Sequence, residues 1–183
     1  MELRERIAGE RRRLRKVREA LSAAVAQTSQ GDDAYIPFYI GIADYFEAAM
    51  ERLHTQDVRM GDLLREKADM DDAENQRVLA ELDRRLAGNQ EHLKEFLAGG
   101  KALRDQREKA LGQYEAAAKA YTDYIVTNMG HHAGSTDLAR ATFSDEDWNY
   151  MANISEADMA REEDLFERVF ATMPASLELT PSD

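Results

Sequence analysis

The sequence predicts an all-α protein, arranged as an up-down four-helix bundle with an additional C-terminal helix. Apolar residues recur at intervals of three, four or seven through most of the chain, which is the spacing of one face of a helix. No segment alternates apolar and polar residues for long enough to form a strand. The 183 residues include only 10 Gly and 3 Pro, too few for an all-β chain with many turns.

The first expected helix spans about residues 2–26. The polar residue Glu10 falls on its apolar stripe, where a charge is costly unless it is paired. After a polar loop with Gly31, this helix gives way to the next one. The stripe itself consists of Leu3, Ile7, Leu14, Val17, Leu21 and Val25.

The second expected helix spans about residues 37–70, with Pro37 suited to its first turn. Asp57 sits at the centre of its stripe, and His54 lies at the edge of that stripe, three residues earlier. Side chains at this spacing share a face of a helix. The stripe consists of Tyr39, Ile42, Ala43, Phe46, Met50, Leu53, Asp57, Met60 and Leu64.

The third expected helix begins near residue 73 and carries His92 on the flank of its stripe. Two positions for the turn that follows stay open. A turn at Gly112 places His92 level with His132 of the next helix, whereas a turn at Gly99-Gly100 separates the two histidines. Two adjacent glycines inside a helix cost roughly 2 kcal/mol, so local chemistry favours the second position.

The fourth expected helix presents Tyr114, Tyr121 and His132 on one face and ends between Gly130 and Gly134. A capping-box pattern at residues 144–147 starts a last helix, with Glu162 at the centre of its apolar face. Pro174 ends that helix. The sequence thus predicts one helical-bundle domain over residues 1–174 and a flexible C-terminal tail over 175–183.

Composition narrows the class of protein. The net charge of −12 should repel nucleic acid and anionic membranes, so neither is an expected partner. The absence of cysteine excludes disulfides and thiolate metal sites. With no apolar leader and no membrane-length apolar run, we expect a cytoplasmic protein. A basic run over residues 11–18 is the local exception, and a solvated helix face is favoured over an anion contact there.

Four ionisable residues fall where helical periodicity predicts the interior. They are Glu10, Asp57, His132 and Glu162. Imidazole and carboxylate ligands on four helices suit a site for iron, manganese or zinc better than one for copper(I). The alternative is that each charge pairs with an interior arginine such as Arg85 or Arg107. The residues alone leave these two interpretations equal.

Three pairs of residues are spaced as metal ligands are spaced in one known family. They are His54 with Asp57, Glu91 with His92, and His132 with Asp137. The last pair matches a His-x4-Asp element, and the first resembles His-x3-Glu with one residue fewer. Phe96 stands where a second histidine of the third element belongs, and Glu10 stands where the first helix would supply one. The order of these elements resembles the hemerythrin-like, HHE cation-binding family.

The resemblance implies a four-helix bundle that binds non-haem iron, with one or two metal ions. It also implies binding or sensing of O2, NO or peroxide, or iron handling, rather than turnover of a substrate. The expected partners are then the metal ion and a small diatomic ligand. The metal ligands that the resemblance implies are His54, Asp57, His92, His132 and Asp137, with Glu10 as a substitute ligand.

A second interpretation stays open: a metal-free structural or protein-interaction module that keeps the bundle and has lost the metal site. The missing histidines and the Gly99-Gly100 pair favour it. An oxidative iron enzyme would need Glu-x-x-His on two helices, which the sequence does not provide. Apolar residues on a second face of the last helix, Leu165 and Phe170, indicate either association, as a homo-oligomer or with a protein partner, or further packing within the chain.

Overall fold

The computed structural model describes residues 3–129 and 133–179, and every regular element in that part of the chain is helical. The all-α prediction is confirmed. No helix within the described residues combines the length and the apolar character needed to cross a bilayer. The elements are α1 (Leu3–Gln27), α2 (Tyr35–Lys67), α3 (Ala73–Gln106), the 3₁₀ turn η1 (Arg107–Ala110), α4 (Leu111–Tyr124), the π-helical turn η2 (Ile125–Met129), α5 (Ala133–Thr142), α6 (Asp145–Met151) and α7 (Glu156–Ala171).

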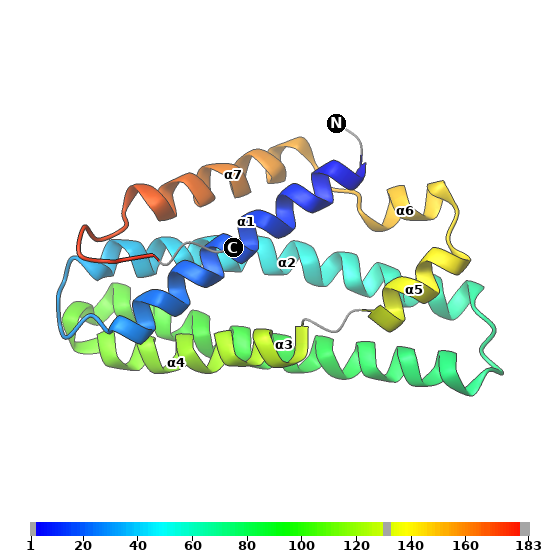
Figure 1. The fold of residues 1–183 in the computed structure, drawn as a ribbon, viewed down its shortest axis with the longest axis horizontal. Coiled ribbons are helices and arrows are strands. Elements are labelled where there is room, and N and C mark those ends of the chain that lie inside the picture. Colours follow the sequence, from blue (N-terminus) through cyan, green and yellow to red (C-terminus); the bar gives the residue numbers. More distant parts are fainter. Residues whose placement is uncertain (1–2, 130–132, 180–183) are drawn as a thin grey trace.

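Helix α2 lies at the centre of the molecule (Figure 1). It packs against α3 on one side and against α7 on the other, and α4 returns along α3. Helix α1 contacts both α2 and α4, while α5 and α6 cover the end of α2 that is nearest its C-terminus. The turn from α2 to α3 is fixed by Asp72, whose carboxylate accepts a hydrogen bond from the backbone N–H of Glu74 at 2.7 Å. Because α3 and α7 pack on different sides of α2, this helix needs two apolar faces.

The turn between α3 and α4 lies at residues 107–110, close to Gly112 and not at Gly99-Gly100. Helix α3 runs straight through Gly99-Gly100 as far as Gln106, and the chain reverses at Arg107, whose φ is +55°. The position favoured by local chemistry, Gly99-Gly100, was wrong.

Close packing explains why two glycines lie inside α3. A Cβ added to Gly100 would lie 2.9 Å from the Cβ of Ala43 in α2. One added to Gly99 would lie 3.5 Å from the Cα of Tyr114 and 3.4 Å from the Cβ of Ala117, both in α4. The pair lets three helices approach closely, and the dense packing between them offsets the poor helix propensity of glycine.

The buried apolar residues fall into two clusters along the helices. The larger one includes stacked and edge-on rings from α2, α3 and α4, and within it the Tyr114 hydroxyl donates to the backbone carbonyl of Tyr39 at 2.9 Å. The smaller one lies near the α2–α3 turn and includes Met60, Leu64 and Leu82. Polar residues occupy the level between them, which makes this level the candidate functional site.

The C-terminal part differs from the sequence prediction in two ways. The capping box at Ser144 and Asp147 is present, but the helix it starts ends at Met151. A second cap at Ser155 begins α7, so the single expected helix is two helices. Helix α5 was not expected, because its 10 residues cover too few turns for the apolar period to stand out.

The first residues of the expected tail pack against the core. Leu177 is only 6% exposed, and the side-chain amide of Gln27 donates to the carbonyl of Glu178 at 2.8 Å. Two residues of the predicted tail over 175–183 thus contact the helices, and its last residues, 180–183, lie outside the described part.

Replacing Gly100 by alanine should lower the free energy of unfolding by about 1–3 kcal/mol, because the added methyl overpacks the contact with Ala43. Gly112→Ala is the matched control, since nothing lies within 4 Å of its added Cβ. It should be neutral or stabilise α4 by up to about 1 kcal/mol. Urea unfolding of both variants measures the difference, and equal effects would contradict the packing explanation.

Candidate functional site

A layer of polar side chains separates the two apolar clusters. We define this polar layer as Glu10 of α1, Arg52, Gln56 and Asp57 of α2, Arg85 and Asn89 of α3, and Glu162 of α7. In α2 the larger cluster ends at Met50 and the smaller one begins at Met60, and the same switch occurs between Phe96 and Leu82 in α3. Four helices thus bring polar groups to one level of the interior.

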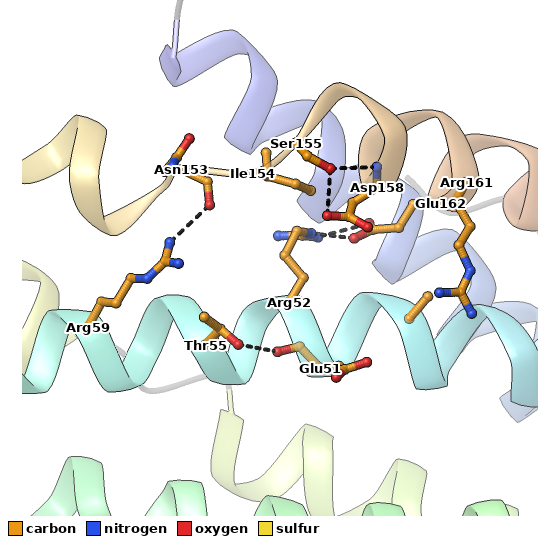
Figure 2. Close-up of a pocket in the computed structure, with 11 residues that line it drawn as sticks. Glu51, Arg52, Thr55, Arg59, Asn153, Ile154, Ser155, Asp158, Arg161 and Glu162 are labelled. Atoms are coloured by element: carbon orange, nitrogen blue, oxygen red, sulfur yellow. Dashed lines mark hydrogen bonds and ion pairs between the residues drawn. The ribbon is translucent and has the colours of Figure 1, made fainter.

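Arg52 is the centre of this layer (Figure 2). Its guanidinium makes a two-pronged contact with Glu162, from Nε to Oε1 at 2.5 Å and from Nη2 to Oε2 at 3.1 Å. Its Nη1 donates to Glu10 Oε2 at 3.1 Å and to Gln56 Oε1 at 3.3 Å. Arg52 therefore links α1, α2 and α7 through one side chain.

All three charged groups of this network are almost fully buried. The side chain of Arg52 is 9% exposed, and those of Glu10 and Glu162 are each 5% exposed. Arg6 adds a second cation, with Nε 3.5 Å from Glu10 Oε1. Buried carboxylates are tolerated when a guanidinium neutralises and hydrogen-bonds them, and a two-pronged contact is the strongest form of that pairing.

Sequence reasoning named Arg85 and Arg107 as interior arginines and missed Arg52. The signal is a second buried stripe of α2, separate from the apolar stripe that contains Asp57. That stripe recurs at intervals of three, four and seven and consists of Phe38, Tyr45, Ala49, Arg52, Gln56 and Leu63. A helix with two such stripes is central, and a charge on either stripe needs an interior partner.

Asp57 lies on the other side of α2, towards α3. Burial raises the pKa of its carboxyl group to about 6, and the charges of Arg85 and Arg11 oppose that rise only in part. Arg85 donates from Nη2 to Ser135 Oγ at 3.3 Å. Asp57 makes no hydrogen bond or ion pair with another described residue, unlike Glu10 and Glu162.

His54 and His92 have different neighbours. The side-chain amide of Gln90 donates to His54 Nε2 at 2.8 Å, whereas the His92 ring lies on the Tyr124 ring with centroids 4.4 Å apart. Gln90 and His92 are two residues apart in α3, so their side chains leave the helix about 200° apart. The two histidines thus occupy opposite flanks of α3.

The remaining predicted ligands are also placed by the structure, except one. Asp137 is exposed on α5 and accepts from Arg140 at 2.9 Å. Glu10 faces Arg52 and Arg6 rather than a histidine. His132 lies outside the described residues, and so does His131. Within residues 3–129 and 133–179 no group of three or more His, Asp or Glu is placed to hold a metal ion, and the six-residue ligand set stays a prediction.

A π-helical turn adjoins the polar layer. It follows Tyr124, whose hydroxyl donates to the backbone carbonyl of Arg85 at 3.1 Å. This contact ties the end of α4 to α3 at the level of the layer. π-Helical turns are often found at functional sites, and here the turn precedes the His131-His132 pair in the sequence.

An open pocket of about 460 Å³ lies between α2 and the start of α7 (Figure 2). Arg52 and Glu162 line it, and Arg59 closes one end by donating to the carbonyl of Asn153 at 3.0 Å. Its six charged residues are three arginines and three carboxylates, so the pocket favours neither an anion nor a cation.

The sequence matches no protein-family model, and comparisons with curated proteins and with solved structures find no match.

Replacing Arg52 by methionine should lower the free energy of unfolding by about 3–5 kcal/mol, because Glu10 and Glu162 would be left buried without a counter-charge. Arg65→Met on the same helix is the control. Arg65 pairs with Asp62 and Asp83 while 42% exposed, so its loss should cost less than about 1 kcal/mol. Denaturant unfolding at pH 7 compares them, and similar losses would contradict a central role for Arg52.

Asp57 should make stability depend on pH. Its pKa rises from 3.8 to about 6 in the folded protein, so the folded state holds the proton more tightly than the unfolded chain. The resulting stability is present below about pH 4 and is lost as the pH rises through about 6, with a total of roughly 3 kcal/mol.

Asp57→Asn should remove this dependence. The variant should be more stable than the natural protein. This difference in unfolding free energy should be roughly 1 kcal/mol larger at about pH 7.5 than at pH 5. Urea unfolding at the two pH values measures it. A gain that is the same at both, or a larger loss at the higher pH, would show that Asp57 is not destabilised by burial.

Proposed function

We propose that this chain is a metal-free protein-interaction module of the cytoplasm. In this proposal α1 to α4 form an up-down four-helix bundle, with α7 as an additional helix packed on α2. The observation that supports it is the position of Arg52, whose guanidinium lies between the buried carboxylates of Glu10 and Glu162. An arginine here supplies the positive charge that a metal ion would otherwise supply.

The charge balance of the network supports the same proposal. Both oxygens of Glu162 accept from Arg52, and Glu10 Oε2 does too, whereas Glu10 Oε1 lies 3.5 Å from Arg6 Nε in an ion pair, without a hydrogen bond from any described residue. A metal ion at this point would have to displace a buried guanidinium, which would then lack a partner. A rigid scaffold held by internal ion pairs leaves function to its outer surface.

A second candidate is the hemerythrin-like iron protein, and one observation favours it. His54 Nδ1 is buried and has no hydrogen-bond partner among the described residues. Asp57, three residues later on the same helix, has a carboxylate without an ion pair in the same part of the chain. In this second proposal these two side chains and His132 would hold the iron, while His92, Asp137 and Glu10 would keep the partners described above.

Metal analysis separates the two candidates. Protein purified without a histidine tag and loaded anaerobically with Fe(II) should retain less than about 0.1 equivalents of iron, zinc or manganese. Its melting temperature should be the same with and without EDTA, because folding does not depend on a metal.

The iron protein would give the opposite result in both measurements. Retention of about one equivalent or more, together with a melting temperature that falls in EDTA, would support the iron protein. Asp57→Asn would then abolish both effects, whereas Asp62→Asn, an exposed carboxylate on the same helix, would leave them unchanged.

A further inference from the structure

Two neighbouring helices carry exposed like-charged residues with the same spacing. The basic triad on α1 is Arg11, Arg12 and Arg15, and the acidic triad on α7 is Glu163, Asp164 and Glu167. Each triad occupies positions i, i+1 and i+4 of its helix, so each presents a compact patch of one sign. All six side chains are exposed, and none forms a hydrogen bond or ion pair with another residue that the structure describes.

Other helices arrange their surface charges differently. On α3, Arg77 pairs with Glu74 at 2.6 Å and Arg84 with Glu81 at 2.7 Å, each within one turn of the helix. Lys119 and Asp123 form such a pair on α4. Like charges four residues apart instead destabilise a helix. Arg11 is partly balanced within the chain, because its charge acts on Asp57, whereas Arg12, Arg15 and the acidic triad form no ion pair with another described residue. These charges are left to be neutralised from outside the chain.

The net charge of the whole chain limits which partners the basic triad can bind. Residues 3–27 carry eight Lys or Arg and three Asp or Glu, a net charge of +5 in a chain of −12. The rest of the chain would repel an extended polyanion such as nucleic acid or an anionic membrane. A compact acidic patch of matching size suits the basic triad better, because repulsion beyond the contact is screened within about 8 Å at physiological salt.

The acidic triad of α7 is such a patch. Helices α1 and α7 are neighbours, with the Lys16 ammonium 4.7 Å from the centre of the Phe170 ring. Both run in the same general direction (Figure 1). A two-fold axis along them would place α1 of each copy on α7 of the other, so that both triads are used twice. The equal spacing of the triads keeps their charges in register.

We propose that the partner is a second copy of this chain, bound through the basic triad of α1 and the acidic triad of α7. This inference rests on the proposed interaction function, since it names the partner of that module. The apolar residues that suggested self-association in the sequence, Leu165 and Phe170, pack against the core instead, so the charged triads are the surface that associates.

Sedimentation velocity on the full chain, with metal content measured on the same sample, tests the proposal. The natural protein at about 100 µM should sediment as a dimer. Arg12→Glu/Arg15→Glu alone and Asp164→Lys/Glu167→Lys alone should each sediment as monomers, because each places like charges across both contacts. An equimolar mixture of the two variants should restore the dimer, since every contact again joins opposite charges.

A matched control reverses two arginines elsewhere. Arg77→Glu/Arg84→Glu on α3 changes the net charge by the same amount and should leave the dimer intact. Circular dichroism checks that all variants fold. A monomeric natural protein, or a failure of the mixture to restore the dimer, would overturn this inference while leaving the proposed metal-free module in place. Bound metal would instead overturn the proposed function.

Discussion

The structure depends on a buried arginine between two buried carboxylates. Arg52 belongs to the central helix α2, and its partners Glu10 and Glu162 come from the first and last long helices of the chain. Each carboxylate alone would be costly at 5% exposure. Together the three groups join α1 and α7 to α2 through one buried network.

This ion pairing also bears on whether the polar layer is interpreted as a metal centre or as an internal salt bridge. Interior charges in a helical protein can indicate a metal centre, and the same residues can indicate an internal salt bridge. The two cases differ in what lies between the carboxylates. Here a guanidinium lies between Glu10 and Glu162, although Glu10 Oε1 and Gln56 Nε2 have no hydrogen-bond partner among the described residues. On the other side of α2, Asp57 has no ion pair and His54 Nδ1 has no hydrogen-bond partner in the same part of the chain. The two halves of the layer therefore differ in how their carboxylates are paired.

Much of the fold follows from the sequence, and the errors have physical causes. Apolar periodicity is enough to predict α1 to α4, because each helix buries a regular stripe. It does not show that Gly99-Gly100 stays helical, because that depends on Ala43 and Tyr114 of neighbouring helices. The break before Ser155 was missed because the apolar pattern continues in phase across it.

The candidate site was predicted less completely. The sequence identifies Glu10, Asp57 and Glu162 as interior charges, because they interrupt apolar stripes. It does not reveal their partners, since those depend on which helices are adjacent. Arg52 was missed because α2 buries two faces, and that is known only once α7 is seen to pack on it.

The most direct test of this account is a comparison of Arg52→Met with the triple variant Arg52→Met/Glu10→Gln/Glu162→Gln in equilibrium urea unfolding at pH 7. If buried, unpaired charge is what makes the single variant unstable, the triple variant should recover most of the roughly 3–5 kcal/mol that the single one loses. A triple variant no more stable than Arg52→Met would contradict the claim that Arg52 acts by neutralising Glu10 and Glu162.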